Sequence, residues 1–113
     1  MIRGLIRRWL EEAPDIAVVA TASDGETALR TAASARPDVL LLDIEMPGLD
    51  GIDVARALAA RQPSAAVVFI TAFDQFAVAA FDVAAIDYLM KPVDADRLAR
   101  SIDRARAYLV ARA

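Results

Sequence analysis

The chain of 113 residues contains no cysteine and no histidine, and this double absence limits the chemistry available to it. Without cysteine there are no disulfides and no thiolate metal sites. Without histidine, the commonest general base and the commonest transition-metal ligand are both missing. Any reaction at this protein must therefore use carboxylates, hydroxyl groups or the amine of a lysine.

Lysine is itself scarce, because twelve of the thirteen basic residues are arginine and Lys91 is the exception. An ammonium is a compact point charge and a guanidinium is a planar fork, so the two are not equivalent at a tight anion site. Lys91 stands directly before Pro92, after a short apolar run. It either marks an anion site or reflects chance in a composition that favours arginine.

Long apolar runs and net positive charge are also missing. No run reaches the roughly 18 apolar residues of a membrane span, and residues 1–13 carry five charges with no cleavable apolar segment, so we expect no signal peptide. The net charge of −3 argues against nucleic-acid binding. The length predicts a single domain, 1–113, that is large enough to bury a core.

Helical and strand patterns alternate along the chain. Amphipathic periodicity and capping residues predict helices over about 1–13, 24–35, 51–61, 75–81 and 95–109. Ser23 with Glu26 forms a capping-box pattern for the second helix, and Asp74 and Asp94 are expected to cap the last two. Short apolar runs predict strands at 16–20, 39–42, 66–70 and 86–90.

This alternation predicts an α/β fold, with a doubly wound parallel sheet and helices on both of its faces. The run at 39–42, Val-Leu-Leu-Leu, does not alternate with polar residues, which is typical of a strand buried on both faces. In open sheets of this kind, reaction sites lie beyond the carboxyl ends of the strands. Asp43, directly after that run, is therefore a candidate functional residue.

Three of the predicted strands end in polar residues, namely Asp43, Thr71 and Lys91. On parallel strands these ends converge on one edge of the sheet. A carboxylate, a hydroxyl and an ammonium within reach of each other suit phosphoryl transfer, with the carboxylate as nucleophile and the other two groups binding the transferred oxygens. The alternative is a structural ion pair between Lys91 and Asp43, with Thr71 as a turn residue.

The same strand ends carry motifs of a known family. The chain resembles the receiver domain of two-component response regulators at Asp43, 46–48 (Met-Pro-Gly), 50–51 (Asp-Gly), 70–72 (Ile-Thr-Ala) and 88–92 (Tyr-Leu-Met-Lys-Pro). The segment 71–92 is similar to receivers that are attached to LytTR-type DNA-binding domains. The resemblance implies a flavodoxin-like three-layer sandwich.

The resemblance also assigns roles to particular residues. It implies that Asp43 accepts a phosphoryl group from a histidine kinase, forming an aspartyl phosphate, while Thr71 and Lys91 bind the phosphate. Tyr88 would act with Thr71 as the switch, and Mg²⁺ would be held by Asp43 and the backbone carbonyl of Glu45. The protein would be a cytoplasmic signalling domain rather than an enzyme, with a cis bond before Pro92.

One part of the family pattern is not found in this sequence. Receivers open with an apolar strand and a pair of acidic residues that help to hold Mg²⁺, whereas here a helical pattern begins at once. We therefore expect an N-terminally truncated receiver, 1–113, that binds Mg²⁺ weakly. The sheet would be completed by exchange with a second chain or by pairing of 16–20 with 39–42, and a homodimer is expected.

Two other functions fit parts of the pattern. A haloacid-dehalogenase-like phosphatase also combines a strand-end Asp with a Thr or Ser and a Lys, but it needs a second aspartate where this chain has Glu45. A receiver-like module that dimerises without phosphorylation is the other alternative, and it agrees with the missing acidic pair. Binding of a phosphate analogue with Mg²⁺ separates the receiver from this module.

Overall fold

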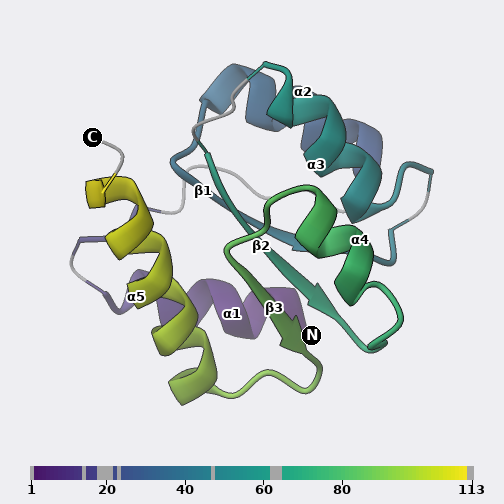
Figure 1. Ribbon diagram of the computed structural model, residues 1–113. Coiled ribbons are helices and arrows are strands. Elements are labelled where there is room, and N and C mark those ends of the chain that lie inside the picture. The colour runs from purple at the N-terminus through teal and green to yellow at the C-terminus, as the bar shows by residue number, and fades with distance from the viewer. Residues whose placement is uncertain are drawn as a thin grey trace.

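The computed structural model describes residues 2–13, 15–17, 22, 24–46, 48–61 and 65–111. Helices and strands alternate through most of this chain (Figure 1). Their order is α1 (Ile2–Glu11), α2 (Gly25–Ala35), β1 (Val39–Asp43), α3 (Gly51–Ala59), β2 (Ala66–Thr71), α4 (Ala77–Asp82), β3 (Asp87–Met90) and α5 (Ala95–Ala111).

The three strands form one parallel sheet in the order β1-β2-β3. Asp43 at the end of β1 pairs with Ile70, and Thr71 at the end of β2 pairs with Met90. At the carboxyl edge β2 thus extends one residue beyond β1, whereas β2 and β3 end level. The predicted strands at 39–42, 66–70 and 86–90 are confirmed to within one residue.

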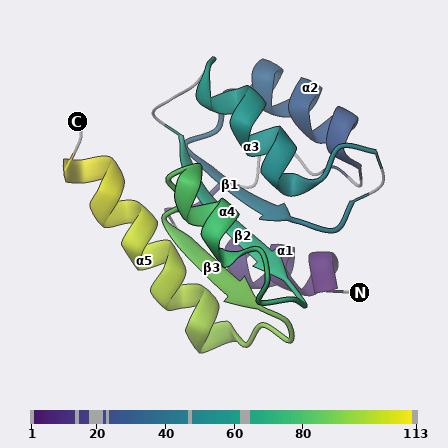
Figure 2. The same cartoon turned by 45° about the vertical axis from the view of Figure 1, so that its right-hand side comes forward.

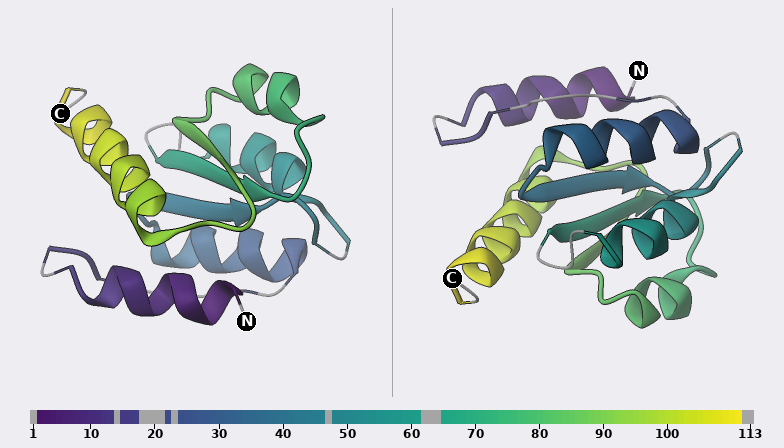
Figure 3. Two further views of the ribbon diagram at one scale, coloured as in Figure 1. Left: turned by 90° about the horizontal axis from the view of Figure 1, so that it is seen from below. Right: turned by 90° about the horizontal axis from the view of Figure 1, so that it is seen from above.

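Helices cover both faces of the sheet, so that the core is split in two. On one face, α2, α3 and α4 pack against Leu40, Leu42 and Phe69. On the other face, α1 and α5 pack against Val68 and Ile70. Figure 2 shows α4 in front of the strands with α1 behind them, and both views of Figure 3 place α1 and α4 at opposite extremes of the molecule. The predicted three-layer arrangement is confirmed.

Two of the predicted helix caps are wrong. Asp24 rather than Ser23 caps α2, because its extended backbone (φ −144°, ψ 164°) lets its carboxylate accept the N–H of Thr27 at 2.8 Å. Helix α4 begins at Ala77 with Phe76 at the cap position and no side-chain cap, so Asp74 stands too early to cap it. The third expected cap is confirmed, since Asp94 accepts the N–H of Arg97 at 2.7 Å.

The strand predicted at 16–20 is not tested in full. Ile16 and Ala17 are described and belong to no strand, whereas 18–20 lie outside the described residues, as does Ser23. The proposed pairing of this segment with β1 therefore lies outside the described residues too. Next to the segment, Asp15 accepts two hydrogen bonds from Arg106, at 2.8 and 2.9 Å, which ties the end of the first helical region to α5.

A buried carboxylate joins β3 to α5. The side chain of Asp87 is only 6% exposed and accepts two hydrogen bonds from the guanidinium of Arg97, at 2.8 and 2.9 Å. The backbone N–H of Tyr88 donates a third, at 2.8 Å. Burial alone would raise the pKa of Asp87, but Arg97 and the Tyr88 N–H outweigh it and hold that pKa below its usual value. This pair orients β3, whose carboxyl end leads into Lys91.

Candidate functional site

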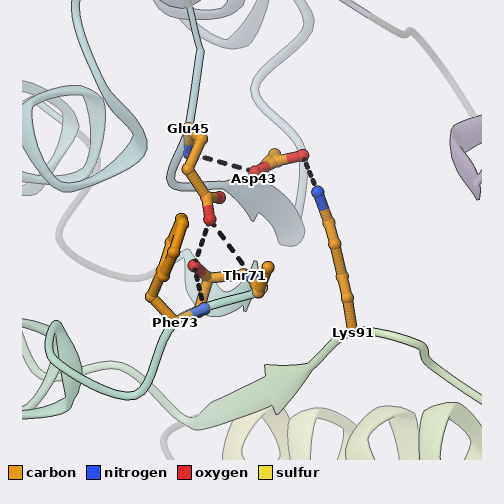
Figure 4. A network of polar contacts seen from close by, with 6 residues as sticks. Asp43, Glu45, Thr71, Phe73 and Lys91 are labelled. Carbon is orange, nitrogen blue, oxygen red and sulfur yellow. Dashed lines mark hydrogen bonds and ion pairs between the residues drawn. The ribbon is translucent and has the colours of Figure 1, made fainter.

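The three predicted strand-end residues meet at the carboxyl edge of the sheet (Figure 4). Lys91 Nζ lies 2.7 Å from Asp43 Oδ2, although the two residues are 48 positions apart in the sequence. The backbone N–H of Lys91 donates to the carbonyl of Thr71 at 2.8 Å, which extends the β2–β3 ladder by one step. The parallel register therefore brings the carboxylate and the ammonium into direct contact.

Asp43 is accessible but partly desolvated. Its side chain is 34% exposed and that of Lys91 is 25% exposed, so both groups reach solvent at the edge of the sheet. The second carboxylate oxygen accepts the backbone N–H of Glu45 at 3.0 Å. Burial, followed by the neighbouring Glu45 carboxyl group, raises the pKa of Asp43, and the Lys91 ammonium only partly offsets this. The arrangement is an oriented carboxylate next to a cation.

The side chain of Glu45 is a member of the site that the sequence did not predict. Its Oε1 accepts the hydroxyl of Thr71 at 2.6 Å and the backbone N–H of Ala72 at 3.1 Å. Burial opposes ionisation of Glu45, but the neighbouring Asp43 carboxyl group and the hydrogen bonds donated by Thr71 and Ala72 lower its pKa to about 2. The sequence did contain a sign that the Glu45 side chain belongs to the site, because this glutamate follows the strand-end Asp43 by only two positions in the same loop.

A series of hydrogen bonds leads from Thr71 to the aromatic residue predicted as part of the switch. Thr71 is fully buried, and its hydroxyl oxygen accepts the backbone N–H of Phe73 at 3.2 Å. The hydroxyl of Tyr88 in turn donates to the carbonyl of Phe73. Thr71 and Tyr88 are thus connected through the backbone of one intervening residue.

The loop after β1 is held close to α3 by backbone contacts. Asp50 caps α3 by accepting the N–H of Asp53 at 2.9 Å, and the N–H of Gly51 donates to the carbonyl of Ile44 at 3.0 Å. A Cβ atom on Gly51 would overlap the carbonyl oxygen of Asp43 and lie 3.0 Å from its carbonyl carbon. Only glycine therefore allows α3 to start this close to the end of β1.

Two general features of the described chain bear on the site. In 2–13, 15–17, 22, 24–46, 48–61 and 65–111, no group of three or more Asp or Glu side chains is placed to hold a metal ion. Across the same residues, no helix is both long enough and apolar enough to cross a membrane.

The bond between Lys91 and Pro92 is cis, as the family resemblance implied.

Comparison with known proteins identifies the family. Residues 1–103 match the model of the response regulator receiver domain, so the chain belongs to that family. It is 43% identical over 110 residues, or 96% of its length, to an uncharacterised response regulatory protein of Vibrio cholerae, and 33% identical over 104 residues, or 92% of its length, to the sensory transduction protein LytT of Bacillus cereus. These matches cover 42% of each relative, so the chain spans less than half of their length.

A solved structure supports the same conclusion. The receiver domain of AraT, a response regulator of Geobacillus stearothermophilus, superposes with a TM-score of 0.84 at 34% identity, covering 96% of this chain and 90% of that domain. The predicted flavodoxin-like receiver fold is thereby confirmed, and so is the resemblance read from the strand-end motifs. The LytT relative agrees with the predicted likeness to LytTR-associated receivers.

Proposed function

We propose that this receiver domain is a phosphoacceptor of two-component signalling, with Asp43 as the residue that becomes phosphorylated. The observation that carries the proposal is the contact between Asp43 and Lys91 at the edge of the sheet where Thr71 also ends its strand. A nucleophile, a cation and a hydroxyl donor at one position are what phosphoryl transfer to a carboxylate requires.

The transfer would proceed by in-line displacement. A carboxylate oxygen of Asp43 attacks the phosphorus of a phosphohistidine on a histidine kinase. The new O–P bond forms while the P–N bond breaks, and the histidine nitrogen leaves with the electron pair. Lys91 moves from the carboxylate to the phosphoryl oxygens as negative charge gathers there, and the Thr71 hydroxyl donates to another of these oxygens.

Magnesium would assist this step. Mg²⁺ prefers oxygen ligands, keeps several of its waters, and is commonly bound through one or two carboxylates together with phosphate oxygens. The Asp43 carboxylate, one-third exposed, and the backbone carbonyl of Glu45 are suitable donors. When bound, the ion would neutralise charge on the phosphoryl group. Because the described residues bring no three acidic side chains together, we propose that binding is weak.

Phosphorylation would then change the surface around Tyr88. Thr71 is linked through Phe73 to the hydroxyl of Tyr88, so a phosphoryl group that draws Thr71 toward it would disturb the Tyr88 contact. The partners would be a histidine kinase in the cytoplasm and a second copy of the chain. The module would act as a switch in signalling rather than as an enzyme with a substrate of its own.

The alternative function is a receiver-like module that dimerises without phosphorylation. It is favoured by the sparse set of metal ligands among the described residues. Beryllofluoride with Mg²⁺, an analogue of the aspartyl phosphate, separates the two functions because only a phosphoacceptor site should bind it.

Exchange of Lys91 for arginine tests the proposal. In a beryllofluoride titration with Mg²⁺ followed by backbone amide NMR, the parent should saturate, whereas Lys91→Arg should bind at least about tenfold more weakly while staying folded. The guanidinium keeps the charge but is too large and too planar to replace a point donor that contacts Asp43. The opposite exchange at an exposed position, Arg100→Lys, is the control and should bind like the parent. Equal binding by Lys91→Arg would contradict the role proposed for Lys91.

We further propose that the dimer forms through the surface of α4 and β3. Phe81 and Val78 on α4 are 83% and 73% exposed, while Phe73 before α4 and Met90 at the end of β3 are about half-exposed. Several exposed apolar side chains in adjoining segments indicate an interaction surface better than a single one does. A partner chain that covers them stabilises the fold by mass action.

Sedimentation can test this assembly. The parent should form a dimer at micromolar concentration, and its melting temperature should rise with protein concentration. Phe81→Glu should shift the species to a monomer because it places a charge in the apolar contact. Val110→Glu, at an equally exposed apolar position near the end of α5, is the matched control and should remain dimeric. A compact monomeric parent with a concentration-independent melt would rule out this assembly.

A further inference from the structure

The carboxylate of Glu45 already uses the hydrogen-bond donors nearest to the proposed phosphoryl site. Its Oε1 receives both the hydroxyl of Thr71, at 2.6 Å, and the N–H of Ala72, at 3.1 Å. Figure 4 shows Glu45 reaching from the loop after Asp43 across to the end of β2. An anionic oxygen thus lies at the place where two donors from a neighbouring strand end converge.

Each of these two groups can donate only one hydrogen bond. A threonine hydroxyl has one proton to donate, and a backbone amide has one as well. The Thr71 side chain is fully buried, and its oxygen already accepts the Phe73 N–H, so the hydroxyl group is constrained on both sides. Glu45 Oε1 and a phosphoryl oxygen therefore cannot both be fully hydrogen-bonded by Thr71 and Ala72.

Electrostatic repulsion also opposes the presence of the Glu45 carboxylate and a phosphoryl oxygen at the same two donors. A phosphoryl group on Asp43 would add charge beside the carboxylate that follows it in the same loop, and like charges at close range repel. Glu45 is itself an exposed residue, so its side chain can turn into solvent and be hydrated there. The contact with Thr71 and Ala72 is accordingly one that can be broken without unfolding the domain.

We propose that the Glu45 carboxylate is an internal competitor of the phosphoryl group, occupying the Thr71 hydroxyl and the Ala72 amide in the resting state. The proposal rests on the function proposed for Asp43. Glu45 must leave before a phosphoryl oxygen can take its two hydrogen bonds, and this lowers the affinity of the site for the phosphorylated state. Through Phe73, the same contact holds the Thr71–Tyr88 connection in its resting arrangement.

The test compares three substitutions of Glu45 in the whole chain, each of which retains the backbone carbonyl. Glu45→Ala removes the competitor, and it should bind beryllofluoride with Mg²⁺ about tenfold more tightly, the gain expected when two hydrogen bonds need not be broken. Glu45→Asp keeps the charge but is shorter by one methylene, and it should also bind several-fold more tightly. Glu45→Gln keeps the length and an acceptor oxygen, so it should fall between the parent and Glu45→Ala.

A second readout needs no phosphate analogue. In the free protein the Ala72 amide proton is hydrogen-bonded to a carboxylate, so its NMR signal should lie downfield in the parent and move upfield in Glu45→Ala and Glu45→Asp. An unchanged Ala72 signal in both variants would overturn the proposal.

The titrations also separate this inference from the function on which it rests. Equal affinity of the parent and Glu45→Ala would overturn only the competition. If Glu45→Gln matches Glu45→Ala while Glu45→Asp matches the parent, charge alone decides affinity and occupancy of the donors is overturned. Absence of binding by the parent and by every variant would overturn the proposed phosphoacceptor function, and the competition with it.

Discussion

Asp43→Asn is expected to abolish covalent labelling of the protein by acetyl phosphate. An amide oxygen is a poor nucleophile toward phosphorus, and no other carboxylate described in the chain contacts Lys91. Intact mass after incubation with acetyl phosphate and Mg²⁺ should show one added phosphoryl group on the parent and none on the variant. We expect slow labelling of the parent, because few protein ligands support the metal and Glu45 occupies Thr71.

The matched control for this experiment is Asp53→Asn. Asp53 is an exposed carboxylate on α3, ten positions further along the chain. Asp53→Asn makes the same chemical change as Asp43→Asn, but in a residue outside the site. Its labelling should equal that of the parent. Stoichiometric labelling that survives Asp43→Asn would show that another residue is the acceptor.

The second large effect is expected at Gly51. Gly51→Ala places a methyl group against the backbone carbonyl of Asp43 and 3.0 Å from the Cα of Ile44, and backbone atoms cannot move aside as a side chain can. We expect a loss of about 3 kcal/mol in the free energy of unfolding. The shifted end of β1 should slow labelling of Asp43 by roughly a hundredfold, because small displacements of reacting groups are costly.

Denaturant unfolding and the rate of labelling measure the two effects of Gly51→Ala. Gly48→Ala is the control, since a Cβ added at Gly48 would meet no atom within 4 Å, although the backbone there is left-handed with φ 76°. There an added methyl group costs only backbone strain, about 1–2 kcal/mol. A Gly51→Ala protein as stable as the parent would show that the loop after β1 adapts freely, contrary to the packing described.

Local patterns predicted most of the fold because they depend on near neighbours in the chain. The apolar runs that became β1 and β2 were recognisable because they contain no alternating polar residues. Only β2 is almost fully buried, however, since alternate residues of β1 are half-buried and β3 ends in the exposed Met90. Helix caps were predicted less well. Ser23 was the predicted cap, but the next residue, Asp24, became the cap of α2 because its backbone conformation directs its carboxylate to Thr27.

The sequence by itself determined the class of fold, the strand-end positions of Asp43, Thr71 and Lys91, and the family that these motifs indicate. Parallel pairing follows from the alternation of helices and strands, and it forces such ends to one edge. Only the tertiary structure decided that Glu45 reaches Thr71, 26 residues away, and that Asp87 is buried against Arg97. Side-chain partners of this kind depend on register and on the packing of separate elements, which no local pattern encodes. The physical reason is that a carboxylate loses its water only where the folded chain brings donors to replace it.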